Sequence, residues 1–558
     1  MDNSREKIAS IVRDAITKTA MDAGIALPDD IPILVERPKM GIHGDWATNA
    51  AMKFSKMFGL KPLDLASKLE AAVEKGNLIE WIEVVPPGFI NFGLTSSWVP
   101  ETIRNVIEKG DNYGSNDIGH GKRVQIEFVS ANPTGPLHLG HGRGGAVGDI
   151  LSSILSFSGW NVEREYYIND AGFQMENLGK STQSRYFAHF GHGEEAPFPE
   201  DGYPGDYIDD IVRVIAEEHG DKLLAIPLDE TLPLFRDRTC ELVLDMIKRD
   251  LADFGINFDV WFSEKSLYKG DLVDRTVALL KSNNYVYEHE GAVWFKATMF
   301  GDDRDRVMIR NNGVPTYFTS DTAYLLNKYE RGFDLLIYIW GADHHGYVPR
   351  MRSVNKALGR EDESIEFLLI QFVSLLRDGE PVAMSKRAGT FVTLREIMEE
   401  VGSDATRFSF INRKCDSHLD FDLEVAKRTS SDNPVFYVQY AHARICSILR
   451  EAESRGIGIP ELTSVDLDLL RDHSEVRLVK EISRFPEEVV QAASNLEPHR
   501  IAFYTTALAE AFHAFYNTVK VLGESPDIMN ARLTLAEAAR ITIANALKLL
   551  GVSASEKM

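Results

Sequence analysis

Two short runs of the sequence are apolar at almost every position, and they constrain the fold more than any other feature. They are Leu335 to Trp340 and Phe367 to Val373. Such continuous runs are typical of strands buried on both faces, as in a parallel sheet covered by helices. A third strand, Val124 to Val129, is followed by a loop at Ala131 to Pro136 and by an amphipathic helix that ends near Ser158-Gly159. Strands separated by helices over this length predict an α/β domain on a Rossmann-like, doubly wound parallel sheet.

The rest of the chain divides into regions of different character. Its 558 residues, at about 150 residues per domain, predict roughly three to four domains. Residues 1–115 alternate helical patterns with short strand-like runs, which predicts a small α+β domain. Residues 116–390 hold the doubly wound sheet, with a Pro-, Gly- and acid-rich insertion at about 190–270. Residues 391–432 connect it to residues 433–558, where apolar spacing predicts an all-α bundle.

Composition excludes several classes of protein. The apolar share of 44% and charged share of 26% are those of a folded globular chain, not of a disordered or fibrous one. No apolar stretch approaches the roughly 18 residues of a membrane helix. The charged N-terminal segment and three widely separated cysteines predict a cytoplasmic protein. The net charge of −23 argues against polyanion binding by the overall field, although a local basic patch could still hold a nucleic acid.

The strongest chemical signal lies between Ala131 and His141, after one predicted strand and at the start of a predicted helix. His138 and His141 are three positions apart, so both rings lie on one side of the first turn. Backbone N–H groups at a helix start favour an anion, and Gly140 lets a phosphate or ring system approach closely. The motif predicts a phosphate site. A surface histidine pair is the alternative, and a metal site is weaker because no third ligand follows at a recognised spacing.

A second signal is the small, basic segment Ala383 to Thr390, which contains Lys386 and Arg387. Cationic side chains beside small residues can approach a polyphosphate and neutralise charge that develops on it. Alone, the segment reads as a solvated basic turn. Together with the histidine motif it predicts a nucleotide triphosphate site.

With these motifs in place, the sequence resembles class I aminoacyl-tRNA synthetases. His138-Leu139-Gly140-His141 matches that class's HIGH signature, and Met384-Ser385-Lys386 matches the core of its KMSKS signature. Over essentially the whole chain it is similar to the bacterial type of the arginyl-tRNA synthetase family. The stretches that carry this resemblance are His43–Asn49, Pro87–Phe92, Glu127–Thr134, Ile168–Gly172, Trp340–Tyr347 and Asn433–Arg444.

The resemblance implies a two-step reaction with ATP and Mg²⁺. Arginine attacks the α-phosphate of ATP to give arginyl-adenylate and pyrophosphate, and the arginyl group then passes to the 3′ end of tRNA(Arg), releasing AMP. In this family the first step requires bound tRNA. The catalytic residues implied are His138, His141 and Lys386. The ATP-binding residues implied are Pro136, His138, Gly140, His141, His344, Met384, Ser385 and Lys386.

The signature segment departs from its consensus. Ala383 stands where the class has its first lysine, and Arg387-Ala388 stands in place of the second serine. We therefore assign phosphate binding to Lys386. The resemblance also implies a monomer without structural zinc or an obligate protein partner.

Selection of arginine needs carboxylates, because a guanidinium group is best met by a bidentate acceptor. By the resemblance, two acids bind the amino acid, Glu127 and Asp321. Ser130, Asn132 and Tyr317 complete the implied arginine-binding set. Which acid takes the guanidinium group and which takes the α-amino group stays open at this stage.

An acidic protein that binds tRNA must cluster its cations and stacking rings locally. Phe89 and Asn91 match the positions that this family uses to read an exposed D-loop base, which assigns residues 1–115 to D-loop recognition. Tyr440 and Arg444 lie on a segment that resembles the anticodon-reading helix, which assigns residues 433–558 to anticodon binding and residues 391–432 to stem contact. The alternative in each case is ordinary packing in a strand or on a helix face.

Two other readings of the sequence are weaker. A small-molecule nucleotidyltransferase would share the histidine motif but have no use for tRNA-reading segments at both ends. A non-catalytic tRNA-binding relative has no chemical reason to keep His138, His141 and Lys386 together. Cys415 and His418 have metal-ligand spacing without a partner pair, and the glycines of Gly142–Gly148 lie beyond the turn that a dinucleotide site needs.

Overall fold

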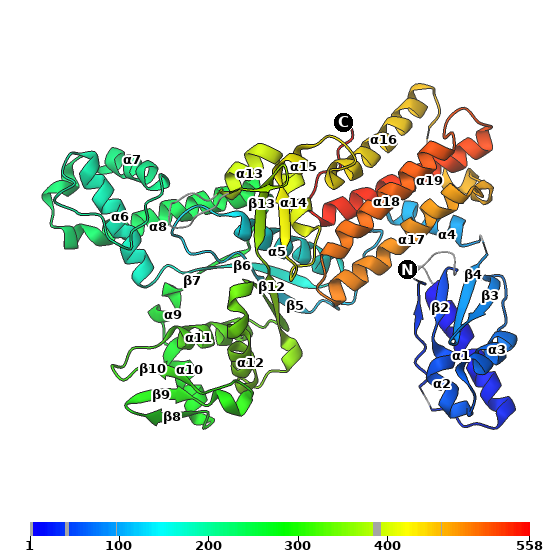
Figure 1. Cartoon of the computed structure of the whole chain (residues 1–558), viewed down its shortest axis with the longest axis horizontal. Helices are drawn as coiled ribbons and strands as arrows, with labels where there is room; N and C mark the ends of the chain where they lie inside the picture. The colour runs from blue at the N-terminus through cyan, green and yellow to red at the C-terminus, as the bar shows by residue number, and fades with distance from the viewer. Residues whose placement is uncertain (1–3, 29, 39–43, 96, 383–391, 459) are drawn as a thin grey trace.

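The computed structural model describes residues 4–28, 30–38, 44–95, 97–382, 392–458 and 460–558. Figure 1 shows a central sheet, two lobes projecting from it on one side, and on the other side a long helical bundle with a small N-terminal domain beside it. Within the described residues, no helix is long and apolar enough to cross a membrane.

The N-terminal domain is α+β, as expected. Its antiparallel sheet has the strand order β1-β2-β4-β3, and helices pack against it. The elements are α1 (Ser4–Ala23), β1 (Val35–Glu36), β2 (Trp46–Thr48), α2 (Ala50–Phe58), α3 (Pro62–Ala72), β3 (Ile79–Val85) and β4 (Phe89–Leu94). Helix α4 (Trp98–Lys109) follows this domain and packs on the C-terminal bundle, chiefly on α17 (His473–Ser494) and α19 (Pro526–Leu549). Ion pairs from Asp45 to Lys480 (2.8 Å) and from Arg37 to Glu487 (3.3 Å) tie the N-terminal domain to α17.

The central sheet confirms the doubly wound prediction. Its five strands are all parallel, in the order β12-β11-β5-β6-β7. Strand β5 is the first in sequence and lies in the middle, so the chain order reverses between β5 and β11. The strands are β5 (Arg123–Glu127), β6 (Asn161–Ile168), β7 (Val260–Ser263), β11 (Leu335–Gly341) and β12 (Ile365–Ile370).

Helix α5 (Leu139–Phe157) packs closely on this sheet, and the glycines of Gly142–Gly148 explain how. A Cβ atom at Gly148 would lie 2.3 Å from the ring of Phe128, which follows β5. No side chain fits in that space, so only glycine permits the approach of helix to strand. Gly145, where an added Cβ atom would lie 2.9 Å from the Ile256 side chain, also serves packing, whereas Gly144 has no neighbour within 4 Å.

One strand prediction was wrong in its extent. The run Phe367 to Val373 is not one strand, because β12 ends at Ile370 and β13 (Val373–Arg377) begins a second sheet. The chain is interrupted at Gln371, whose N–H donates to the Cys415 carbonyl and whose carbonyl accepts from the Arg143 guanidinium, both at 2.9 Å. These contacts come from distant segments and leave no trace in the local pattern.

Two lobes interrupt the doubly wound domain (Figure 1). The first is helical, with α6 (Phe173–His189), α7 (Tyr207–His219) and α8 (Leu228–Asp253). Strand β7, inside the stretch 190–270, pairs with β6 and belongs to the central sheet. The second lobe carries an antiparallel sheet that the sequence analysis did not anticipate. Its elements are α9 (Lys265–Lys269), α10 (Leu272–Ser282), β8 (Val286–His289), β9 (Ala292–Phe295), β10 (Arg306–Ile309), α11 (Tyr317–Glu330) and α12 (Val348–Ala357).

The C-terminal part is a helical bundle, as predicted, joined to the sheet by a small connecting unit. The connecting elements are β13, β14 (Glu380–Pro381), α13 (Leu394–Val401), α14 (Ser403–Ile411), β15 (Leu419–Asp422) and α15 (Leu423–Lys427). The bundle consists of α16 (Pro434–Ser454), α17 (His473–Ser494), α18 (His499–Thr518) and α19 (Pro526–Leu549). Gly551 follows α19 with a left-handed φ of 61°, the conformation expected after a helix end.

A single buried guanidinium group joins three of these regions. Arg407 of α14 is 1% exposed. It donates to the Leu550 carbonyl after α19 (3.2 Å), to the Phe254 carbonyl after α8 (3.0 Å) and to the Asp149 carboxylate of α5 (2.5 Å). The bundle, the helical lobe and α5 therefore meet on one side chain.

Candidate active site

The predicted site residues gather where the chain order of the sheet reverses. Ligands of open α/β sheets bind at this point, beyond the carboxyl ends of the strands. The histidine motif follows β5, and the 3₁₀ turn Ala342–Tyr347 follows β11. Asn169 and Glu264 follow β6 and β7, so residues after the carboxyl ends of four neighbouring strands lie at one edge of the sheet.

The two histidines form a rigid pair at the start of α5. The Gly140 N–H donates to His138 Nδ1 (3.1 Å), and the His138 N–H donates to His141 Nδ1 (3.3 Å). The rings are stacked, with centroids 3.7 Å apart and planes inclined by 21°. Because Nδ1 accepts in each ring, the proton of a neutral imidazole resides on Nε2. The helix start thus presents two imidazole N–H donors beside its own positive dipole end.

The turn between β5 and the motif is strained. Val129 and Ser130 have φ values of 64° and 39°, which are unfavourable for side chains other than glycine, above all for branched valine. This turn places the Ser130 hydroxyl 3.3 Å from Glu127 Oε1 and 3.1 Å from the Tyr167 N–H, which donates to it. Strain of this kind concentrates at functional sites, where the surrounding structure holds it.

Glu127 is buried and already paired. Its Oε2 atom accepts from Lys328 Nζ at 2.6 Å, and the lysine side chain is fully buried. Lys328 comes from α11, the helix that also carries Tyr317 and Asp321. Sequence reasoning missed this lysine because nothing local links it to Glu127.

Asp321 and Glu264 are carboxylates held in a poorly solvated pocket. Burial raises the pKa of Asp321 to about 6, with the charge of Glu127 adding to the shift, while a hydrogen bond from the Tyr347 hydroxyl acts against it. Burial raises the pKa of Glu264 to about 7, with the charges of Asp321 and Asp170 contributing. Neighbouring desolvated carboxylates of this kind favour a cationic ligand.

Glu264 and Tyr347 were not among the predicted site residues. Glu264 is 4% exposed and follows the apolar run Val260–Ser263. Had that run been recognised as a strand, the rule that sites lie at carboxyl ends would have found the acid.

The remaining predicted arginine contacts, Asn132 and Tyr317, are exposed to solvent. The Asn132 amide accepts from Asn169 and donates to Gln174, both at 2.7 Å. Tyr317, the first residue of α11, is 67% exposed.

The structure brings only part of the predicted ATP site together. Gly140 and His141 lie on the first turn of α5, with Pro136 just before it. His344 is exposed and its ring lies 5.9 Å from that of Trp340, beyond β11. Met384, Ser385 and Lys386 lie outside the described residues. Thr393, just after that segment, forms a β-bridge with His138.

The predicted tRNA contacts differ in accessibility. Phe89 is 38% exposed, whereas Asn91 is 3% exposed, so neighbouring side chains must move before a base can reach its amide. Arg444 of α16 lies between two rings, 4.7 Å from each of the centroids of Tyr440 and Tyr516. Stacked rings with a cation are suited to unpaired bases.

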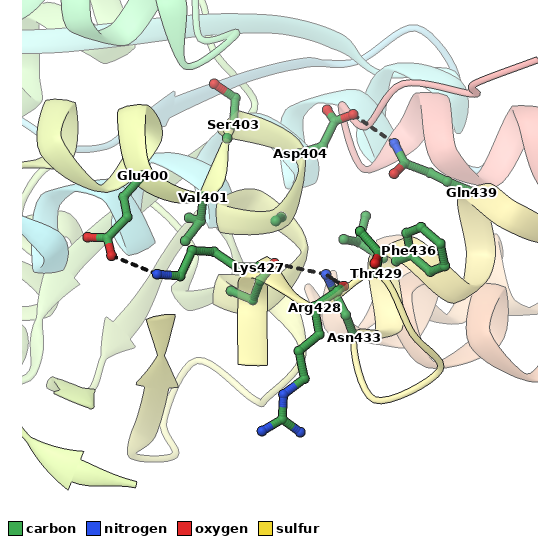
Figure 2. Close-up of a pocket in the computed structure, with 14 residues that line it drawn as sticks. Glu400, Val401, Ser403, Asp404, Lys427, Arg428, Thr429, Asn433, Phe436 and Gln439 are labelled. Atoms are coloured by element: carbon green, nitrogen blue, oxygen red, sulfur yellow. Dashed lines mark hydrogen bonds and ion pairs between the residues drawn. The ribbon is translucent and has the colours of Figure 1, made fainter. Parts of the chain in front are cut away.

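A cavity of about 450 Å³ lies between the connecting unit and α16, away from the crevice (Figure 2). Its polar groups pair with one another. Glu400 accepts from Lys427 (3.0 Å), and Asp404 accepts from Gln439 (2.8 Å). The cavity therefore belongs to the contact between the connecting unit and the helical bundle. Among the described residues, no group of three or more His, Cys, Asp and Glu side chains is placed to hold a metal ion.

Family models match almost the whole chain. "Arginyl tRNA synthetase N terminal domain" matches residues 6–94, "tRNA synthetases class I (R), catalytic domain" matches 102–191 and 214–429, and "DALR anticodon binding domain" matches 438–558. The chain belongs to the arginyl-tRNA synthetase family.

Individual relatives agree with this family. The arginine–tRNA ligase of Syntrophotalea carbinolica is 50% identical over 94% of this chain and 95% of its own length. That of Bacillus subtilis is 46% identical over the full length of both. A solved structure from Campylobacter jejuni, described as a candidate arginyl-tRNA synthetase, is 36% identical, with a TM-score of 0.77 over 83% of this chain and all of that chain. The resemblance drawn from the sequence is confirmed, and the class I fold with it.

Proposed function

We propose that this arginyl-tRNA synthetase activates L-arginine with ATP and transfers it to the 3′ end of tRNA(Arg), releasing AMP and pyrophosphate. The observation that carries the proposal is the meeting of an acid-lined pocket and a histidine-capped helix start in one crevice. ATP–pyrophosphate exchange with each amino acid, with and without tRNA, tests it. Arginine-specific exchange that depends on tRNA is expected; preference for another amino acid contradicts the proposal.

Activation requires no protein nucleophile, because the arginine carboxylate itself attacks the α-phosphorus. The protein positions the reactants and stabilises charge on the phosphate oxygens. His138 and His141 donate from Nε2 to those oxygens, and Lys386 holds the departing pyrophosphate. Mg²⁺ bound together with ATP would neutralise part of the phosphate charge.

The pocket also suggests which way arginine lies. One oxygen of Glu127 is committed to Lys328 and the other is near Ser130, so Glu127 suits a compact donor such as the α-ammonium group. Asp321 and Glu264 are desolvated neighbours with raised pKa values, which suits the planar guanidinium group. Tyr317 and Asn132 contact the substrate from the pocket mouth. The α-carboxylate then points toward ATP at the histidine pair.

This arrangement predicts a pH dependence of arginine binding. The raised pKa values, about 6 for Asp321 and about 7 for Glu264, mean that both acids are largely protonated at low pH. Only the ionised forms attract a guanidinium group, so the arginine KM should fall as the pH rises through this interval and then level off. Glu264→Gln should remove the upper part of the change. A wild-type arginine KM that is constant from pH 5.5 to 7.5, at about 0.5-unit steps, would count against the pocket.

Recognition of tRNA is divided among the regions. Residues 1–115 contact the D-loop, 116–390 carry out catalysis, 391–432 contact the stem, and 433–558 bind the anticodon through Tyr440 and Arg444. Phe89 stacks on an unpaired base, and Asn91 lies under that base. We also propose that the protein is a cytoplasmic monomer. Its three free cysteines suit a reducing compartment and support the location, while the monomer follows from the family resemblance alone.

Phe89→Ala should raise the KM for tRNA about 5- to 150-fold, because stacking on one base contributes roughly 1–3 kcal/mol. The KM for ATP should not change. Met21→Ala, which removes another exposed apolar side chain (76% exposed) from the same domain, is the control. Equal loss for tRNA and ATP, or an effect of the control variant, would point to misfolding.

A further inference from the structure

The pairing of Lys328 with Glu127 has no part in the reaction as described so far. Lys328 is 0% exposed. Its ammonium group lies 2.6 Å from Glu127 Oε2, and 3.9 and 4.3 Å from the ring centroids of Tyr338 and Tyr324. An ammonium group loses several kcal/mol of hydration on burial, so a lysine placed this deep needs the partner that it has.

Lys328 and the half-buried Arg331, both at the end of α11, bind different carboxylates. Glu165, the β6 neighbour of Glu127, is 0% exposed and binds the Arg331 guanidinium through both oxygens, at 2.5 and 3.0 Å. Tyr324 also donates to Glu165. Arg331 therefore balances an acid that lies away from the crevice, whereas Lys328 balances the acid at the strand end, beside Ser130.

Helix α11 links this lysine to the other end of the pocket. Asp321, Tyr324 and Lys328 are spaced by three and four positions, so they lie along one face of the helix. At the start of this face, Asp321 has a raised pKa, and the side chain that donates to it is the neutral Tyr347. At the other end, the charge of Lys328 neutralises Glu127. The two ends of the arginine pocket thus differ in net charge because of a single side chain.

We propose that Lys328 is a positioning residue that sets the direction in which arginine binds. It occupies one of the two carboxylate oxygens of Glu127, so that Glu127 offers a single acceptor to the α-ammonium group and cannot receive the fork of a guanidinium group. The reversed pose, with the guanidinium group at Glu127, would carry the α-carboxylate away from ATP. Lys328 disfavours that pose because it occupies the oxygen that the second arm of the fork would need. This inference rests on the arginine orientation proposed above.

Lys328→Met tests the proposal, since methionine retains most of the buried stem and removes the charge. Without its cation both oxygens of Glu127 are open to a guanidinium fork, and the unproductive reversed pose becomes available to arginine. The arginine KM at pH 7 should then rise at least about 10-fold, which corresponds to about 1.4 kcal/mol of binding free energy. The inhibition constant of 5-guanidinopentanoate, which lacks the α-amino group, should change less than about twofold.

Arg331→Met is the matched control. It removes the half-buried cation of the same network, which makes no hydrogen bond to Glu127, so it should lower thermal stability but leave the arginine KM within about twofold of the wild type. Lys328→Arg keeps the charge and should retain an arginine KM closer to that of the wild type than the neutral variants do. If Lys328→Met fails to fold, Lys328→Gln, of similar size and neutral, is measured in its place.

The outcomes separate this inference from the proposed function. Wild-type enzyme that does not charge arginine, or Glu127→Gln with an unchanged arginine KM, contradicts the proposed function or orientation. If Glu127→Gln raises the arginine KM but the neutral Lys328 variants keep the wild-type arginine KM, the role of Lys328 is refuted. Parallel losses for arginine and 5-guanidinopentanoate would also refute it, because they indicate a collapsed pocket.

Discussion

His141→Ala should lower arginyl-adenylate formation at least about 100-fold, because one preorganised donor to a charged reacting group contributes about 3–4 kcal/mol. His138 and His141 form a stacked pair whose Nδ1 atoms are taken by backbone N–H groups. Removing one ring takes away a donor aimed at the phosphate oxygens. The measurement is single-turnover ATP–pyrophosphate exchange in the presence of tRNA, with the arginine KM recorded alongside and expected to stay within about twofold.

His141 has a structural role as well, because its Nδ1 accepts from the His138 N–H at the start of α5. The experiment must therefore separate the loss of this helix cap from the loss of the donor to phosphate. His141→Gln keeps an acceptor at the third helical position, where glutamine serves in capping boxes. It should restore stability but not exchange. His289→Ala, which removes a histidine 60% exposed on the distant second lobe, should leave both unchanged. Near-wild-type exchange in His141→Ala would refute the assignment of the active site.

Asp321→Asn should raise the arginine KM about 30-fold to several thousand-fold, because removing one partner of a buried charge pair costs about 2–5 kcal/mol. The amide keeps the shape of the side chain and can accept from Tyr347, but it offers only one acceptor to the guanidinium fork. Discrimination against citrulline, whose urea group is neutral, should fall in the same variant. Both are measured in tRNA-dependent exchange, with the ATP KM as internal reference.

The Asp321→Asn variant should lose arginine affinity without losing thermal stability. The pKa of Asp321 in the folded protein, about 6, lies above the ordinary value for aspartate, so ionisation at pH 7 and above disfavours the folded state. The neutral amide removes that penalty, and the melting temperature above pH 7 should not fall. Asp303→Asn, at a carboxylate 73% exposed beside Arg306, is the control. An arginine KM within about twofold of wild type would exclude Asp321 from the pocket.

The sequence predicted the features that depend on local pattern. The strand before the histidine motif, the helix that it opens and the position of Glu127 at a strand end all follow from periodicity and turn residues, and β5, α5 and the crevice agree with them. The family could be recognised because its signatures are contiguous. The antiparallel sheet β8–β10 was missed, because its strands are short and their pattern is weak.

Features that depend on long-range contacts could not be read in the same way. Lys328 and Glu127 are 201 positions apart in the sequence, so only the tertiary fold brings them together. Strand β12 ends before Gln371 because the backbone N–H and carbonyl of Gln371 form hydrogen bonds with the Cys415 carbonyl and the Arg143 guanidinium group. Asn91 was expected to face a base, but the packing of β4 buries it. In each case the deciding partner is far away in the chain.

The contacts of Arg407 have a mechanical consequence. Its three acceptors belong to the last turn of the bundle, the base of the helical lobe and the helix that begins with the histidine pair. A fully buried guanidinium group cannot give up one acceptor for water, so these bodies have to shift together rather than slide past one another. A displacement of the bundle is therefore coupled, through one side chain, to the helix whose first turn carries the two imidazoles.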